Sequence, residues 1–84
     1  MSVLLYEDPK IKDIKSKLKK MRIAKGYTQE SLADLSGVNI KSLSLFEQKP
    51  EKLIAASTAT VYKLADSLGV DIDDIINKEN IKDE

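Results

Sequence analysis

The 84-residue chain contains no cysteine and no histidine. Without cysteine it can form neither a disulfide framework nor a thiolate metal site. Without histidine it lacks the commonest metal ligand and the usual general base, so a catalytic site would have to rely on carboxylates, hydroxyls and lysines. We therefore expect neither an enzyme nor a cofactor. No apolar run approaches the roughly 20 residues of a membrane span, and the first residues do not form a secretory signal. These absences predict a cytoplasmic protein without a membrane partner.

The formal net charge is zero, but the charged residues are unevenly distributed along the chain. Residues 1–26 carry eight basic and three acidic side chains, a charge of +5, and the remainder carries six and eleven, a charge of −5. A neutral chain lacks the basic footprint that nucleic-acid-binding proteins normally show, and the asymmetry offsets this only in part. With 42% hydrophobic and 33% charged residues, the composition is that of one small globular domain.

Apolar residues at three- and four-residue spacing predict a compact all-α fold of five helices. The first helix is expected over residues 8–25, because Asp8 is a suitable N-cap, Pro9 suits the first turn and Gly26 suits the end. Lysines occupy half of its other positions. Its buried stripe is expected to be Ile11, Ile14, Leu18 and Met21.

Two short helices follow, with very little chain between them. Thr28 is expected to cap the first of them, Gly37 to end it, and Asn39 to cap the second. Only Gly37 and Val38 separate the first helix from the second cap, and so tight a connection forces a steep crossing. This predicts a helix-turn-helix at about residues 28–47. The residues of the earlier helix that we expect to face inward are Leu32, Ala33 and Leu35.

Residues 48–54, read as QKPEKLI, are expected to form a loop around Pro50. A fourth helix should run from residues 55–57 to Leu68, and Asp71 should cap a short fifth helix. The buried side chains of these two helices are predicted to be Val61, Leu64, Ala65, Leu68, Ile72, Ile75 and Ile76. The polar end, NKENIKDE, is expected to fray. The predicted organisation is an apolar arm (1–7), the domain (8–77) and a polar tail (78–84).

The acidic residues at the start of the fifth helix, Asp71, Asp73 and Asp74, are a possible metal site. Their spacing lacks the glycine and the distal glutamate of an EF-hand loop. Carboxylates in the first turn of a helix are favourable because they face the positive end of the helix dipole. We therefore interpret these residues as a helix start, and no metal is expected.

Two segments carry a family resemblance: LKKMRIAKGYTQESLADLSGVNIKSLSLFE and TVYKLADSLGVDIDDII. They resemble the Xre/Cro/C1 family of helix-turn-helix proteins, the lambda-repressor-like DNA-binding domains, over roughly residues 14–77. The resemblance implies a transcriptional regulator, in particular a repressor, that binds double-stranded DNA in a sequence-specific manner. It further implies that the third helix, residues 39–47, enters the major groove and that a homodimer reads paired half-sites.

The resemblance also implies roles for individual residues. Gln29 matches a glutamine that contacts phosphate, and Thr28 beside it would do the same. Three further phosphate contacts are expected apart from the family pattern: Asn39 at the start of the third helix and the ammonium groups of Lys49 and Lys52. A structural pair, Arg22 with Glu47, would tie the third helix to the first and set the angle at which DNA is read. After this glutamate the family usually has Asn-Gly, whereas this chain has Gln48-Lys49. Lys49 therefore requires either a different backbone turn or an unfavourable positive φ.

A helical wheel of the third helix places Leu43 and Phe46 on its inner side. The outward arc, which in the family reads base edges, comprises Ile40, Lys41, Ser44 and Leu45. Two of these four side chains are aliphatic, so they cannot make the bidentate hydrogen bonds that discriminate bases. They can only pack, for example on a thymine methyl group.

Three interpretations of Ile40 and Leu45 remain open. In the first, they contact thymine methyl groups of A·T-rich sites in a DNA-binding protein. In the second, they form an apolar surface for a protein partner, as in an antitoxin or a phage-regulator component, because exposed aliphatic side chains on a small domain suggest an interaction site. In the third, neighbouring segments cover both residues and neither has a direct function.

Overall fold

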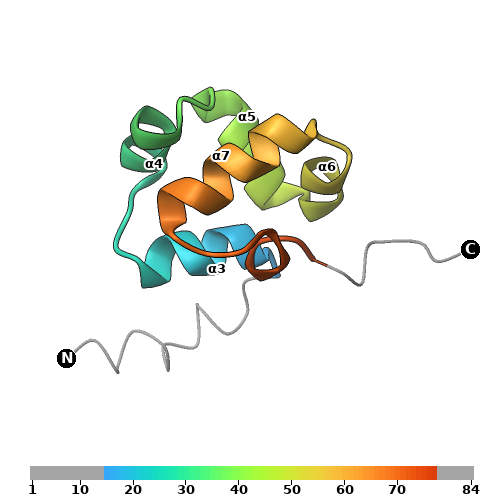
Figure 1. Ribbon diagram of the computed structural model, residues 1–84, viewed down its shortest axis with the longest axis horizontal. Helices are drawn as coiled ribbons and strands as arrows, with labels where there is room; N and C mark the ends of the chain where they lie inside the picture. Colours follow the sequence, from blue (N-terminus) through green and yellow to red (C-terminus); the bar gives the residue numbers. More distant parts are fainter. Residues whose placement is uncertain (1–14, 78–84) are drawn as a thin grey trace, which may run out of the picture.

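The computed structural model describes residues 15–77, and within this range it contains five α-helices, one 3-10 helix and no strand (Figure 1). The elements are α3 (Lys17–Ala24), α4 (Gln29–Ser36), α5 (Ile40–Gln48), α6 (Pro50–Ile54), α7 (Thr58–Leu68) and η1 (Ile72–Asp74). The predicted all-α fold is confirmed. None of the helices in residues 15–77 combines the length and the apolar composition that a membrane crossing requires.

The core lies between α7 and the helices around it. Figure 1 shows α7 crossing the front of the domain, with α4, α5 and α6 above and beside it and α3 below. Each α-helix and the turn after η1 contributes one fully buried side chain to this core: Leu18, Leu32, Leu43, Leu53, Leu64 and Ile75. The predicted stripe of α7 is buried in full, and Leu43 and Phe46 anchor α5 as expected. Ile72 and Ile76 are partly buried against the core.

The predicted boundaries between α4 and α5 are confirmed. The Thr28 hydroxyl accepts a hydrogen bond from Ser31 N at 3.0 Å, and the Ser31 hydroxyl accepts one from Thr28 N at 2.9 Å. Gly37 ends α4 with a φ of +77°, a left-handed conformation that a residue with a Cβ rarely adopts. Asn39 Oδ1 then accepts from Lys41 N at 2.7 Å and caps α5. These local signals produce the tight helix-turn-helix connection.

The predicted start of the first helix is wrong within the described residues. Instead of continuing a helix from residue 8, the chain is extended at Ser16, with φ −75° and ψ 119°, and α3 begins at Lys17. The Ser16 hydroxyl accepts a hydrogen bond from Lys19 N at 3.1 Å, so it caps the helix at a point where the apolar spacing gives no sign of an interruption. The expectations for residues 1–14 and 78–84 lie outside the described residues.

Asn77 explains why the chain breaks at Ser16, and it corrects the prediction that the polar end frays from this residue onward. Its side chain is buried, and Asn77 as a whole is 2% exposed. The Asn77 amide donates to the carbonyl of Lys15, while its Oδ1 accepts from Lys17 N at 2.9 Å. One side chain thus holds the backbone on both sides of Ser16, and we call this arrangement the Asn77 bridge.

The segment after α5 was predicted to be a loop, but Pro50–Ile54 forms the short helix α6. Proline is well suited to the first turn of a helix because its missing N–H would have no partner there. It also forces the preceding residue into an extended conformation, and Lys49 accordingly has φ −130° and ψ 87°. Lys49 therefore adopts the different backbone turn rather than a positive φ.

Two further predictions are corrected. Leu35 was expected to face inward but is 55% exposed. At about 100° per residue it lies roughly 110° from the midpoint of Leu32 and Ala33, the buried direction of α4. The fifth predicted helix is a single 3-10 turn, η1, in which Asp71 N donates to Asp74 Oδ2 at 3.1 Å.

Candidate nucleic-acid interface

Helix α5 is attached to the domain by its inner side and leaves its outer side at the surface. Leu43 is fully buried and Phe46 is 8% exposed, whereas Ile40 is 39% and Leu45 41% exposed. Lys41 is exposed and Ser44 is half-buried. The four predicted base-facing residues therefore share one side of one short helix. The exposure of Ile40 and Leu45 disfavours the interpretation in which neighbouring segments cover them.

A buried ion pair connects α5 to α3. Arg22 Nε lies 2.6 Å from Glu47 Oε2, and Arg22 Nη2 donates to Glu47 Oε1 at 3.1 Å. The side chains of Arg22 and Glu47 are only 10% and 2% exposed. Two parallel hydrogen bonds between a guanidinium and a carboxylate fix direction as well as distance. The orientation of the last turn of α5 relative to α3 is therefore restricted.

The same network reaches the start of α4. Arg22 Nη1 donates to the carbonyl of Tyr27 at 2.8 Å, and Gln29 Nε2 donates to Glu47 Oε1 at 2.9 Å. The Gln29 side chain, predicted to contact phosphate, thus lies against Glu47 at the end of α5. Its backbone N–H remains in the first turn of α4, where peptide groups face outward and favour an anion. The network was predicted as a pair, and the sequence pattern contains no sign that Gln29 joins it.

The other predicted phosphate-contacting residues lie around α5. The Thr28 hydroxyl and Asn39 Oδ1 accept hydrogen bonds from their own helices, so both residues act as N-caps. Lys49 lies between α5 and α6, Lys52 lies on α6, and both are exposed. Together with Lys41 they place three ammonium groups on α5, α6 and their connection. The same short helix α6 also carries one exposed carboxylate, that of Glu51.

One residue of this surface, Gln48, was not predicted from the sequence. Helix α5 extends one residue beyond the predicted end, so Gln48 is its last helical residue, and its side chain is exposed. Gln48 Nε2 donates to Ser44 Oγ at 3.0 Å. The wheel contained the relevant signal, because at about 100° per residue Gln48 falls between Ser44 and Lys41. The prediction ended the helix at Glu47 and so left this position out.

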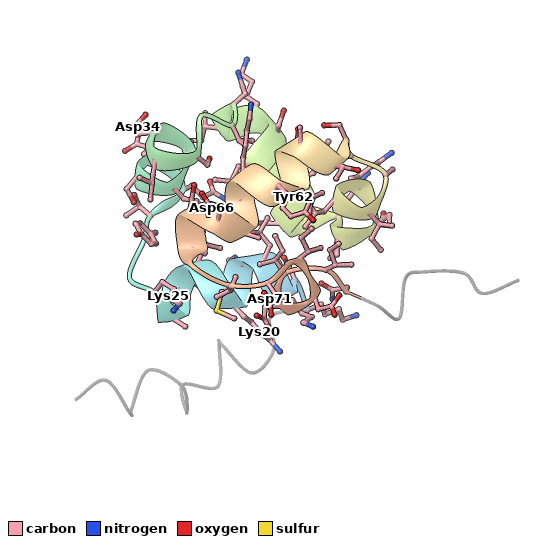
Figure 2. All side chains as sticks on the ribbon, viewed as in Figure 1. Lys20, Lys25, Asp34, Tyr62, Asp66 and Asp71 are labelled. Carbon is pink, nitrogen blue, oxygen red and sulfur yellow. The ribbon has the colours of Figure 1, made fainter. Side chains whose placement is uncertain are left out.

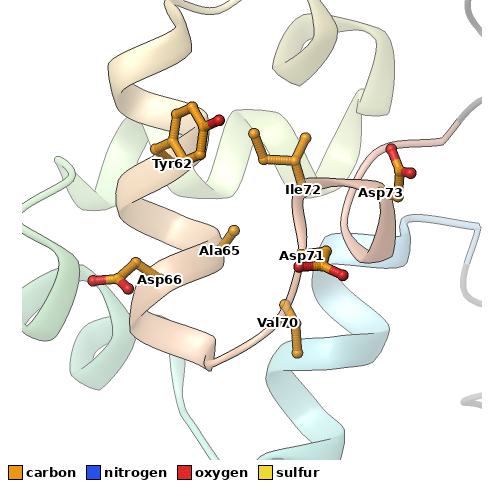
Figure 3. Close-up of a pocket in the computed structure, with 7 residues that line it drawn as sticks. All are labelled: Tyr62, Ala65, Asp66, Val70, Asp71, Ile72 and Asp73. Carbon is orange, nitrogen blue, oxygen red and sulfur yellow. The ribbon is translucent and has the colours of Figure 1, made fainter.

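The opposite charge prevails on another surface. A groove of about 380 Å³ lies between α7 and the segment that contains η1, and it is lined by Tyr62, Ala65, Asp66, Val70, Asp71, Ile72 and Asp73 (Figure 3). Figure 2 shows Tyr62, Asp66 and Asp71 on one side of the domain, with Lys20 below them and Lys25 to their left. Carboxylates around this groove repel phosphate, so the groove is a poor candidate for contact with DNA.

A second hollow, of about 670 Å³, lies beside the helix-turn-helix connection. Its lining includes Glu30 and Asp34 of α4 together with Ile40 at the start of α5. The two carboxylates flank one edge of the outward arc, while Lys41, Lys49 and Lys52 belong to α5, α6 and their connection. Electrostatic attraction to DNA is therefore concentrated on the α5–α6 part of this surface.

The comparison with protein families agrees with this geometry. A family model described as helix-turn-helix matches residues 18–75, which is more than half of the chain. The chain belongs to this family. The match supports the Xre/Cro/C1-like assignment and makes the protein a DNA-binding helix-turn-helix regulator. Neither the curated proteins nor the solved structures gave a significant match.

Proposed function

We propose that the protein is a sequence-specific transcriptional repressor that binds double-stranded DNA as a homodimer. The observation that carries the proposal is the attachment of α5. Its inner side is packed on the core and its end is fixed by the Arg22–Glu47 ion pair, while its outer side stays at the surface. Such a helix can be inserted into a major groove as a rigid element. Two copies would read half-sites about one duplex turn apart.

In this complex the contacts divide into two classes. Lys41, Lys49 and Lys52 would neutralise phosphates, and the starts of α4 and α5, at Gln29 and Asn39, would direct backbone N–H groups at the DNA backbone. Ile40 and Leu45 would pack on thymine methyl groups, and A·T-rich half-sites would be preferred. Thr28 would add a further phosphate contact at the start of α4.

The test is a selection from a library of randomised duplexes, repeated at several salt concentrations. A common motif should emerge from the library, and affinity should fall steeply with salt because phosphate contacts release counterions. Lys41→Ala should weaken binding to every sequence, whereas Ile40→Ala should relax the preference at one position. Lys63→Ala, on the exposed side of α7, is the matched control and should leave the motif unchanged. Absence of any motif at low salt would refute the proposal.

A second function is favoured by one specific observation, the exposure of two aliphatic side chains, Ile40 and Leu45, on the same helix. The outer side of α5 would then bind a protein, as in an antitoxin or a phage-regulator component. In that case Leu45→Glu would abolish copurification of the partner while the helical circular-dichroism spectrum stays unchanged. Retention of the partner by this variant would exclude the second function.

A further inference from the structure

The side chains of Ser44 and Gln48 form a pair on the outer side of α5. They are one helical turn apart, and Gln48 Nε2 donates to Ser44 Oγ at 3.0 Å. Helical side chains tilt toward the N-terminus, so a glutamine at the end of a helix can cover the turn before it. The amide of Gln48 is therefore held beside the middle of α5. It is folded back toward Ser44, one turn before the end of α5.

The amide has the hydrogen-bonding groups of a base-reading side chain. A glutamine amide offers one carbonyl oxygen and two N–H donors. Ser44 accepts one of these donors, so one N–H and Oε1 remain for a ligand. A donor next to an acceptor matches the major-groove edge of adenine, which presents N7 as acceptor and the N6 amino group as donor.

We propose that Gln48 is a specificity-determining residue that recognises adenine in the major groove, with Ser44 as its positioning residue. The inference rests on the proposed function, because it requires α5 to lie in the groove. It supplies the polar base contact that Ile40 and Leu45 cannot make. The adenine contacted by Gln48 and the thymine methyl groups contacted by the aliphatic residues together define an A·T-rich half-site.

The position of the amide favours a base over a phosphate as its target. Exposed lysines are the cations suited to phosphate: Lys49 and Lys52 lie beyond the end of α5, and Lys41 lies in its first turn, so none of the three lies at the middle of the helix, where Ser44 is. Gln48 is neutral, is folded back along the helix, and is placed on the wheel between Ser44 and Lys41. A residue at the centre of the outward arc faces the same surface as the rest of that arc.

The experiment compares wild-type protein with Gln48→Met, which keeps side-chain length and removes both hydrogen-bonding groups. Each protein is used in a selection from randomised duplexes, and binding to the selected site is then measured. The wild type should select adenine at one position of each half-site. Gln48→Met should lose this preference by a factor on the order of ten to a hundred, and the other positions should stay as in the wild type. Ser44→Ala should cause a smaller loss at the same position.

A modified base tests the contact directly. Replacing that adenine by 7-deazaadenine removes N7, so it should weaken binding of the wild type and have little effect on Gln48→Met. Lys49→Met is the matched control, because it should weaken all sequences alike and reduce the salt dependence by about one phosphate contact. A uniform loss for Gln48→Met, or an unchanged motif, would overturn the inference. If the wild type selects no motif at all, the proposed function fails and the inference fails with it.

Discussion

Two buried polar groups hold the two ends of α3, and they differ in chemistry and in what they connect. Near the C-terminal end, Arg22 forms the ion pair with Glu47 and so attaches α5. At the N-terminal end, the Asn77 bridge attaches the last described residue to the backbone of Lys15 and Lys17. The first is charged and belongs to the side of the domain that presents α5. The second is neutral and joins the two ends of the described range, 15–77.

The difference shows how polar groups in a small core divide their roles. An ion pair removed from water contributes little net stability, but it is costly to break because the remaining charge stays buried. Its main effect is to restrict geometry, here the direction of α5. A neutral amide that bonds two backbone groups satisfies them at little desolvation cost and stabilises the fold without directing a functional surface. We therefore expect the two ends of α3 to respond differently to substitution.

The largest loss of stability is expected at the charged, C-terminal end of α3. Glu47→Ala leaves the Arg22 guanidinium buried without its carboxylate, and the free energy of unfolding should fall by about 3–5 kcal/mol. Urea denaturation followed by circular dichroism measures this change. Glu51→Ala, which removes an exposed carboxylate of α6, is the control and should change the free energy by no more than about 0.5 kcal/mol. Similar changes in the free energy of unfolding for the two variants would show that the Arg22–Glu47 ion pair does not stabilise the fold.

The ion pair at the charged end of α3 could be predicted from the sequence, but the Asn77 bridge at its neutral end could not. Arg22 and Glu47 are unlike charges in a recognisable helix-turn-helix pattern, so their pairing could be predicted from their positions. Asn77 stands in a run of polar residues, and its 2% exposure depends on contacts with residues about sixty positions earlier. Composition predicts that such a run frays, because no local pattern encodes a partner so far away in sequence.

The second largest loss of stability is expected at the Asn77 bridge. Asn77→Ala removes the hydrogen bonds to Lys15 and Lys17 and leaves a partly buried backbone N–H and a carbonyl without these partners, so the free energy of unfolding should fall by about 1–3 kcal/mol. Thermal denaturation provides the measurement, with Thr58→Ala at the exposed first position of α7 as control. Below the unfolding transition, the DNA motif selected by Asn77→Ala should equal that of the wild type. A changed motif would mean that this end of α3 also directs α5.

The other differences between prediction and structure also depend on whether a residue acts on neighbouring backbone groups or through contacts distant in sequence. Thr28, Gly37 and Asn39 act on neighbouring backbone groups, so the boundaries of α4 and α5 could be read from the sequence. Pro50 was interpreted as a loop residue although proline also suits a helix start, and Leu53, 1% exposed, shows that tertiary burial favours the helix. Leu35 is apolar but lies off the buried side of α4, a position that composition alone does not exclude.

The smallest effect is expected at Gln29, which extends the charged network to α4. Gln29→Met removes its hydrogen bond to Glu47 but leaves both bonds from Arg22 to that carboxylate, so the loss of stability should be about 1 kcal/mol. Because α5 remains attached, the selected DNA motif should persist. Gln29→Met also keeps the backbone N–H that we propose for phosphate contact at the start of α4, so affinity should change little for any sequence. Fluorescence anisotropy with the selected duplex and with an unrelated duplex measures both quantities. A loss restricted to the selected duplex would instead mean that Gln29 helps to direct α5, and base reading would then depend on both side chains that bond Glu47, Arg22 and Gln29.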